Sequence, residues 1–471
     1  MEKTTLKKSS VNLLISNIFP RVLTIFALPI FLRLIDDSIW GEISFFLAIQ
    51  LIFSNILLFG SESSGIRFFA LLDKNKKVKL KNKNFLISLF SVVFLLLILE
   101  FFMGNYLFAF FDIDYGLPAK LSFFTVFFLV SNRQLVSYFK STNKTSTIKK
   151  SIYIDSLITL FFQFLFVLFI VNYFGFDDRM LASSYFLGQM LGSAFRMFYL
   201  TRKLSFYEDK TYGNSDASIN KYAFYGYLYS IFSVMLTWQD RLIIQYFFEE
   251  DIVAHYSTVY RLTDLHGVVI GASISSFAPF FWNIKNKSIN IDNVFKSIIS
   301  FSTFLGLTGV VIFELFGRFY LPTNYHYAIR YVPIIAVGMI FSSLSALFAL
   351  DLDKRFINKQ RALSMLFALL VNLIINLTYI EKYGIFIAAA SSTIAYCVAM
   401  FWNIYNSKVS LKNVINFHAL LNLLLILSFY ILFYILDITS YIVSISFLIY
   451  SLYFLIKELK NYQFLSKRLS L

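Results

Sequence analysis

Residues 371–396 read VNLIINLTYIEKYGIFIAAASSTIAY. Two apolar runs flank a short stretch, EKYG, at residues 381–384. Extended to 362–380 and 383–405, each run reaches the ~20 mostly apolar residues that a helix needs to cross a hydrocarbon core. The segment therefore predicts two membrane-spanning helices joined by a tight turn.

The same pattern recurs outward from this hairpin in both directions along the chain. Hydrophobic residues make up 58% of the 471 residues and charged residues 15%, whereas a soluble domain carries about 25% charged residues. A soluble core could not hide this much apolar surface, and disordered, collagen-like, coiled-coil and disulfide-scaffold classes are excluded as well. The sequence predicts an all-α polytopic membrane protein with about 14 transmembrane helices; twelve spans followed by a loosely placed last pair is the alternative. The fourteen expected spans are 11–33, 40–66, 85–104, 117–139, 152–174, 179–201, 222–247, 255–281, 295–317, 328–350, 362–380, 383–405, 415–435 and 440–456.

The charge distribution predicts an orientation. The net charge is +15, which in a soluble protein would suggest a nucleic-acid partner. With the N-terminus placed in the cytoplasm, most Lys and Arg fall in cytoplasmic loops, and acids such as Glu249, Glu250 and Asp251 fall on the opposite side. This bias follows the positive-inside rule. We therefore expect cytoplasmic N- and C-termini and no nucleic-acid partner.

An internal repeat divides the chain. Residues 97–107 (LILEFFMGNYL) resemble residues 311–321 (VIFELFGRFYL), which aligns Glu100 with Glu314 at an offset of 214 residues. An even number of helices per copy keeps both copies in one orientation, so the transport site is expected between two lobes near the midplane. The expected division is an N-terminal six-helix lobe at 1–205, a C-terminal six-helix lobe at 206–407, and two additional helices with a cytoplasmic tail at 408–471.

Three segments carry a resemblance to a known family. They are RVLTIFALPIFLRLIDDSIWGEISFF (21–46), DRLIIQYFFEEDIVAHYSTVYRL (240–262) and the hairpin at 371–396. In order and spacing they resemble the polysaccharide (O-antigen or capsule type) flippases, Wzx-like, of the multidrug/oligosaccharidyl-lipid/polysaccharide exporter superfamily. One departure is that the twelfth helix opens Gly384-Ile-Phe-Ile-Ala388, where the family has Gly-x-x-Gly-Ala.

The resemblance implies a fold, a substrate and a location. The fold would be two six-helix lobes in a V. The substrate would be an oligosaccharide linked to undecaprenyl pyrophosphate, moved from the cytoplasmic to the outer leaflet of the bacterial inner (plasma) membrane by alternating access. The partners implied are this glycolipid, membrane lipid, a polysaccharide polymerase and a chain-length regulator.

Charged side chains inside the spans are the candidate site. Each costs at least about 2.5–3.5 kcal/mol to insert, so such residues are functional candidates by default. Arginine stays charged and binds phosphate oxygens in a bidentate manner, which suits a pyrophosphate. The candidate substrate-binding residues are Arg21, Arg67, Arg133, Arg241, Arg261, Asp240, Asp264, Trp238 and Tyr260.

Structural roles remain open for several of these charges. Asp240 and Arg261 lie equally far from the turn near residue 250, so they could form an ion pair between adjacent helices. Arg67, Arg133 and Arg196 could snorkel to the cytoplasmic interface, and Asp155 could cap the fifth helix. Glu100 and Glu314 lie near outer helix ends, where interface or gate contacts are favoured.

No motif favours an enzyme. The sequence contains no Gly-rich phosphate loop, paired catalytic carboxylates or His/Cys metal spacing, so no cofactor and no metal are expected. Transport energy would come from downhill substrate flux or from a coupling ion, H⁺ or Na⁺, bound by Asp240 or Asp264. Two alternatives stay open within the superfamily: a lipid II flippase, and a cation-coupled small-molecule exporter.

Overall fold

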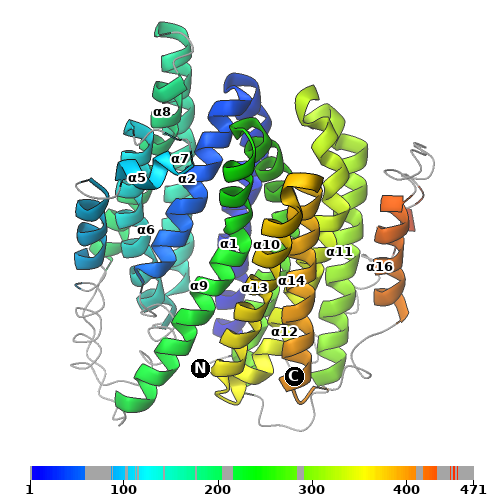
Figure 1. Cartoon of the computed structure of the whole chain (residues 1–471). Coiled ribbons are helices and arrows are strands. Elements are labelled where there is room, and N and C mark those ends of the chain that lie inside the picture. The colour runs from blue at the N-terminus through cyan, green and yellow to red at the C-terminus, as the bar shows by residue number, and fades with distance from the viewer. Residues whose placement is uncertain are drawn as a thin grey trace. The chain divides into compact units, whose positions relative to one another are not determined.

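The described part of the chain is entirely helical. The computed structural model describes residues 3–58, 89–100, 104–111, 116–141, 144–174, 178–203, 216–283, 291–409 and 417–431, together with residues 86, 113, 446, 449, 450 and 453. Within these ranges the regular structure comprises thirteen labelled α-helices, a further helical segment at Leu89–Ile98 and one 3₁₀-helix (Figure 1). This confirms the predicted all-α membrane class.

The chain divides into two compact units. The amino-terminal unit comprises residues 19–254, and the carboxy-terminal unit comprises residues 1–18 and 255–471. Helix α1 (Lys3–Leu34) and helix α10 (Glu250–Asn283) each contribute residues to both units. The lobe boundaries expected after residues 205 and 407 stay a prediction.

Helix α8 organises the amino-terminal unit. It packs along both α7 and α6, while α2 packs against α6, α8 and α9. Aromatic side chains of α2 fill the space between these helices, and Phe45 and Phe46 are fully buried. The helices of this unit beyond α1 are α2 (Asp37–Ile56), α5 (Gly104–Ala109), α6 (Leu117–Ser141), α7 (Thr145–Tyr173), α8 (Asp178–Arg202) and α9 (Asp216–Phe247).

Helix α14 has the corresponding role in the carboxy-terminal unit. It packs along both α12 and α13, and α16 packs against α11 and α12. The two units thus repeat one arrangement, in which the last helix of a trio joins the two helices before it. The elements of this unit beyond α10 are α11 (Ile291–Tyr320), η3 (Thr323–Tyr331), α12 (Val332–Lys354), α13 (Asn358–Tyr383), α14 (Ile385–Asn406) and α16 (Phe417–Tyr430).

The turn between α13 and α14 uses a glycine where the backbone requires one. Gly384 has φ 58° and ψ −142° and lies between the two helices. This conformation is readily available only to glycine. Ile387, which stands in place of the family's second glycine, is half-buried, and the following Ala388 is fully buried.

Two ion pairs lie where α12 ends, and one of them joins α12 to the start of α13. Arg355 contacts Asp351 at 2.8 Å, and Arg361 contacts Asp353 at 2.6 Å. The Asp351 carboxylate also accepts a hydrogen bond from the backbone N–H of Lys408 at 2.9 Å, after α14 has ended. These acids therefore fix three chain segments at one end of the trio.

The predicted spans agree with the helices in order and approximate position. Seven segments of the described part are long and apolar enough to cross a membrane by length and composition. Helices α6, α8, α9 and α10 are not in that set. Each contains a charged residue well inside the helix, namely Arg133, Arg196, Asp240 and Arg261. The expected span at 440–456 and the end of the expected span at 40–66 lie largely outside the described residues.

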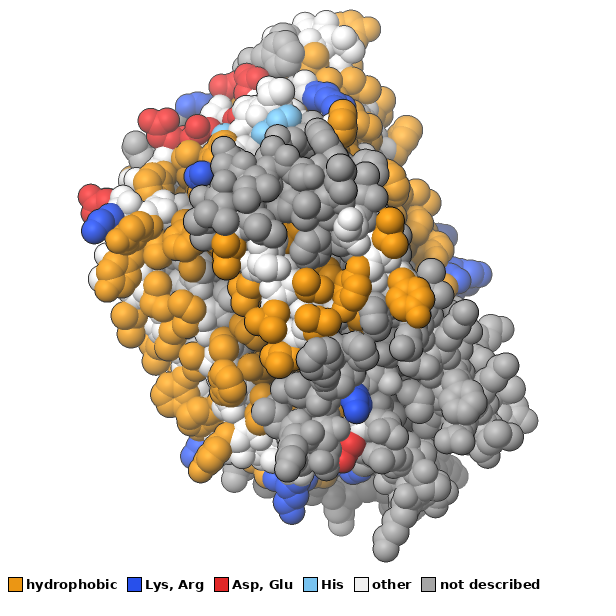
Figure 2. All heavy atoms as spheres, turned by 90° about the vertical axis from the view of Figure 1, so that its right-hand side faces the viewer, with side chains coloured by type: hydrophobic (Ala, Val, Ile, Leu, Met, Phe, Trp, Pro, Cys, Tyr) orange, Lys and Arg blue, Asp and Glu red, His pale blue; other side chains and the backbone are white. Residues whose placement is uncertain are grey.

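The exposed surface fits a lipid environment. Large apolar side chains such as Phe161, Ile374 and Leu377 are more than half exposed. Figure 2 shows hydrophobic side chains across most of the coloured surface on one face, with charged side chains gathered mainly toward its two ends. This is the distribution expected of helices whose outer faces contact acyl chains.

Candidate functional site

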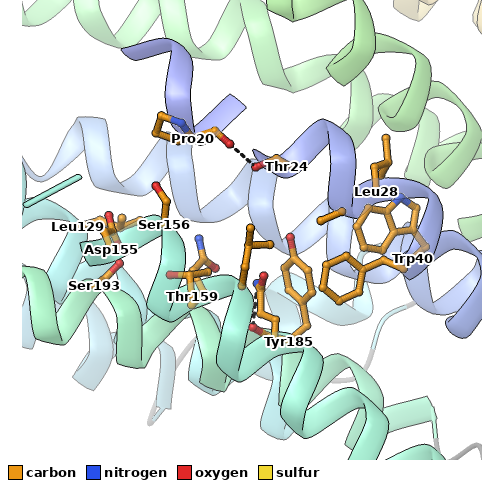
Figure 3. A pocket seen from close by; sticks show the side chains of 15 residues that line it. Pro20, Thr24, Leu28, Trp40, Leu129, Asp155, Ser156, Thr159, Tyr185 and Ser193 are labelled. Carbon is orange, nitrogen blue, oxygen red and sulfur yellow. Dashed lines mark hydrogen bonds between the residues drawn. The ribbon is translucent and has the colours of Figure 1, made fainter. Parts of the chain in front are cut away.

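The amino-terminal unit contains a cavity of about 210 Å³ (Figure 3). Its lining combines residues from α1, α2, α6, α7 and α8, so it lies inside one unit. The lining residues are Pro20, Thr24, Ala27, Leu28, Phe31, Trp40, Leu129, Asp155, Ser156, Thr159, Leu160, Gln163, Tyr185, Gln189 and Ser193.

Two glycines of α8 allow α7 to approach closely and bring its polar side chains to the cavity. A Cβ atom added at Gly192 would overlap the Thr159 hydroxyl and lie 2.8 Å from the Asp155 carbonyl oxygen. A Cβ atom at Gly188 would lie 2.6 Å from the Gln163 backbone nitrogen. Small residues of this kind permit close helix contact in membranes.

One end of the cavity holds a carboxylate that is already paired. Asp155 Oδ2 lies 2.9 Å from Nη1 of Arg196, joining α7 to α8. Both side chains are largely buried, with 19% and 16% exposed. Because the two charges cancel, the cavity presents a hydrogen-bonding carboxylate without an unpaired negative charge.

Amide side chains form the middle of the cavity wall. Gln163 Nε2 donates to the backbone carbonyl of Tyr185 at 3.2 Å. Gln189 Nε2 donates to Oε1 of Gln50, also at 3.2 Å, and Gln50 Nε2 donates to the carbonyl of Ser122. This chain of amides fixes which groups face the cavity.

Aromatic rings form the other end. The Trp40 and Tyr185 rings meet edge to face with centroids 5.7 Å apart, and Phe31 lies 5.7 Å from Tyr185 and 6.2 Å from Trp40. Figure 3 shows Trp40 and Tyr185 on one side of the cavity, and Asp155, Ser156 and Ser193 on the other. The cavity is therefore amphipathic along its length.

Helix α1 contains a proline where it borders the cavity. Pro20 has no backbone N–H to donate, and the Thr24 hydroxyl donates to the Pro20 carbonyl at 2.8 Å. Both features favour bending of a helix. Arg21 follows Pro20 directly and is exposed.

The predicted residues of α9 lie together in a buried cluster. Asp240 and Arg241 are fully buried. The Arg241 guanidinium carbon lies 4.3 Å from the centroid of the Trp238 ring, and its Nη1 donates to the Thr237 carbonyl at 2.8 Å. A buried cation stacked on an indole is an energetically significant contact.

The other predicted site residues are distributed over both units. Tyr260 is buried on α10, Arg261 and Asp264 are half-buried on the same helix, and Arg133 is half-buried on α6. Arg67 lies outside the described residues. None of the eight predicted substrate-binding residues that the structure describes lines the cavity, and the substrate roles of all nine stay predictions.

Sequence reasoning missed the groups that do line it. Asp155 was expected to cap a helix, yet α7 starts at Thr145 with Lys144 as its N-cap, and Asp155 lies well inside it. Arg196 was expected to snorkel to the interface, but it pairs with Asp155. The sequence signal that could have revealed this pair is one acidic and one basic residue in two consecutive expected spans, 152–174 and 179–201. Among the described residues, no group of three or more His, Cys, Asp or Glu side chains could hold a metal ion.

The chain has a fold that is shared by solved polytopic membrane transporters. The structure matches a lipid II flippase, MurJ, in an inward closed conformation with a TM-score of 0.68 and 15% identity, covering 98% of this chain and 99% of that one. It matches a MATE transporter in the bent conformation with a TM-score of 0.60 and 14% identity, covering 91% of this chain and 98% of that one. An inward-facing multidrug resistance MATE transporter of the MOP superfamily matches with a TM-score of 0.58 and 13% identity, covering 86% of this chain and 95% of that one. These neighbours are transporters, not enzymes.

One curated relative is similar in sequence. It is a probable low-salt glycan biosynthesis flippase, Agl15, from Haloferax volcanii, with 25% identity over 188 residues. The match covers 38% of this chain and 40% of that protein, so the chain matches less than half of the relative's length. No family model matches the sequence.

Proposed function

We propose that the chain is a flippase that moves oligosaccharide units linked to undecaprenyl pyrophosphate from the cytoplasmic to the outer leaflet, by alternating access, for surface polysaccharide assembly. The lobes would rock about a site that admits the pyrophosphate and the glycan, while the lipid tail stays in the bilayer. Membrane lipid, a polysaccharide polymerase and a chain-length regulator are the proposed partners.

The observation that carries this proposal is the extent of the structural match. The match with the lipid II flippase covers 98% of the chain, whereas two MATE matches cover 91% and 90% of it and another covers 85%. Helix α16 follows the second trio and packs on α11 and α12, and in this proposal it is one of the two additional helices beyond the two six-helix lobes. The proposal favours a lipid-linked substrate for this reason.

The paired carboxylate in the cavity also supports a flippase over a cation exporter. A cationic drug is attracted by an acid without a partner, and Asp155 already contacts Arg196 at 2.9 Å. Glycan rather than lipid II is favoured by the resemblance of residues 240–262 and 371–396, and by the glycan biosynthesis flippase among the relatives.

Arginines would bind the pyrophosphate in this proposal. Arg21, Arg241 and Arg261 carry permanent charge and planar donors that suit phosphate oxygens. Arg67, Arg133, Asp240, Asp264, Trp238 and Tyr260 complete the proposed substrate-binding set. H⁺ or Na⁺ binding at Asp240 or Asp264 would couple transport to an ion gradient, in a bacterial inner membrane with both chain termini in the cytoplasm.

Overexpression in a drug-sensitive host tests the proposal against the exporter alternative. We expect no rise in resistance to cationic dyes, together with restored surface polysaccharide in cells that lack their own flippase. Dye resistance without restored polysaccharide would overturn the proposal in favour of an exporter. Rescue of a strain depleted of its lipid II flippase, again without restored polysaccharide, would favour lipid II.

A further inference from the structure

We propose that the cavity in the amino-terminal unit binds one sugar ring of the transported glycan. This inference rests on the flippase function proposed above and adds a saccharide subsite separate from the arginines. It is carried by the size, the chemistry and the charge of the cavity.

The size of the cavity suits a single ring. Drug-sized ligands occupy pockets of roughly 300–1,000 Å³, and this cavity has about 210 Å³. A six-membered ring with its hydroxyl groups is a compact ligand for such a space. A longer saccharide would have to extend beyond it, which suits one unit of a larger glycan.

The two ends of the cavity match the two chemical characters of a sugar. A pyranose ring has C–H faces that pack on aromatic rings, whose faces carry partial negative charge. Trp40, Tyr185 and Phe31 supply such rings at one end. The rim of hydroxyls requires hydrogen-bonding partners when it is buried, and Asp155, Thr159 and Ser193 supply them at the other end.

The wall of the cavity contains a buried amide oxygen, Gln189 Oε1, that accepts no hydrogen bond among the described residues. Gln189 uses its amide nitrogen to donate to Gln50, while its Oε1 is buried with no hydrogen-bond partner among the described residues. A buried amide oxygen costs free energy unless a donor reaches it. Gln189 lines the cavity, so a rotation of its amide would let a ligand hydroxyl donate to this oxygen.

The charge of the cavity favours a neutral ligand. Asp155 is the acidic residue in the lining, and Arg196 holds it at 2.9 Å. An organic cation would have to compete with this guanidinium for the carboxylate. A sugar hydroxyl needs only a free lone pair of the same carboxylate, because each ionised carboxylate accepts about four hydrogen bonds.

Binding of free saccharides to the purified full-length chain in detergent tests the inference. Saturation-transfer difference NMR with the methyl glycosides of glucose, galactose and mannose, and with N-acetylglucosamine, detects weak ligands. A ligand of this size binds at best in roughly the millimolar range. We expect transfer to the ring protons of at least one saccharide, with tetraphenylphosphonium failing to displace it.

Variants assign the signal to this cavity. Ala27→Phe places an aromatic ring in the cavity and should abolish the saturation transfer. Gln189→Leu removes the amide oxygen while keeping a similar side-chain volume, and it should weaken the transfer several-fold. Gln360→Leu is the matched control, because Gln360 on α13 also has a buried Oε1 without a hydrogen-bond partner among the described residues but lies outside the cavity lining. Its signal should equal that of the unmodified chain. If Ala27→Phe does not fold, Gln189→Leu against Gln360→Leu still decides the test.

Three results would overturn the inference: no transfer to any of the saccharides, equal transfer in Gln189→Leu and Gln360→Leu, or displacement by the lipophilic cation. The proposed flippase function is measured separately, by the sidedness of glycolipid in cells. A chain that translocates glycolipid without binding saccharide in this cavity loses only the subsite. A chain that binds saccharide without translocating glycolipid loses the flippase function.

Discussion

The ion pair between Asp155 and Arg196 joins α7 to α8 beside the cavity, at 2.9 Å and with less than a fifth of each side chain exposed. Removing one partner of a buried pair leaves an uncompensated charge and costs about 3–5 kcal/mol, whereas replacing both partners with apolar residues is often neutral. Partial exposure lowers the first figure here. The pair is therefore a sensitive point for stability.

Arg196→Leu should lower the free energy of unfolding by about 2 kcal/mol, less than for a fully buried pair because both groups keep some contact with solvent. The double variant Asp155→Leu with Arg196→Leu should regain most of that loss. Thermal unfolding of the purified chain in detergent measures both. A double variant less stable than Arg196→Leu would contradict this view of the pair.

Arg21→Ala and Arg261→Ala should each abolish surface polysaccharide while the protein still inserts, because each removes a proposed phosphate-binding cation. Arg202→Ala is the control, since Arg202 is exposed at the end of α8. Surface polysaccharide is measured with a lectin, and insertion by membrane fractionation. A normal amount of surface polysaccharide in both variants would contradict the proposed phosphate-binding roles of Arg21 and Arg261.

At the residue scale, the sequence indicated which charges lie in spans but not which ones meet. Asp155 and Arg196 were both recognised as intramembrane charges, yet periodicity alone could not show that they face each other. Gln163 and Gln189 gave even less signal, because an amide in a span has no charge pattern to reveal its partner. Arg241 stacks on the ring of Trp238. The two residues are three positions apart on one helix, so this contact is local in sequence.

Close packing of α7 on α8 explains the shape of the cavity at the scale of elements. Gly192→Ala should destabilise the protein by about 1–3 kcal/mol, because the new methyl group meets the Thr159 hydroxyl and the Asp155 backbone carbonyl and overpacking costs that much. Gly309→Ala is the matched control. It lies in α11 with nothing within 4 Å of the added Cβ.

The control substitution should be neutral or stabilising by up to about 1 kcal/mol, since alanine is the better helix former. The difference in melting temperature between the two variants measures the effect. Equal melting temperatures would contradict the close approach of α7 and α8.

Polar side chains hold α13 against α14 in the other unit. Asn372 Nδ2 lies 3.2 Å from Ser391 Oγ and 3.1 Å from Ser392 Oγ, and all three residues are buried. Asn372→Leu should lower the melting temperature by an amount equivalent to about 1 kcal/mol, as interhelical hydrogen bonds in membranes contribute that much. Thr378→Val, on the exposed face of α13, should leave it unchanged.

Helix positions were predictable because they depend on local composition. The expected spans 152–174 and 383–405 agree closely with α7 (Thr145–Tyr173) and α14 (Ile385–Asn406). The 3₁₀-helix η3 (Thr323–Tyr331) before α12 was not predicted, since a short, polar and aromatic segment does not resemble a membrane span. Ile387 replaces the second glycine of the family's pattern, yet α14 packs along α12 and α13 with the adjoining Ala388 buried.

The two units at the whole-molecule scale use one packing scheme twice, with α8 and α14 each joining the two preceding helices of their trios. The internal repeat indicated this from the match of residues 97–107 with residues 311–321. Which residues belong to each compact unit depends on contacts between residues that are far apart in the sequence. Helix α9 packs on α2 and counts with the amino-terminal unit, which local composition could not indicate.

The sidedness of the oligosaccharide glycolipid in cells depleted of this protein tests the central claim most directly. A membrane-impermeant glycosidase or lectin reports how much undecaprenyl-pyrophosphate oligosaccharide reaches the outer face. The flippase account predicts that intact glycolipid accumulates on the cytoplasmic face and becomes accessible only after lysis. Glycolipid that still reaches the outer face at the normal rate in depleted cells would contradict the account.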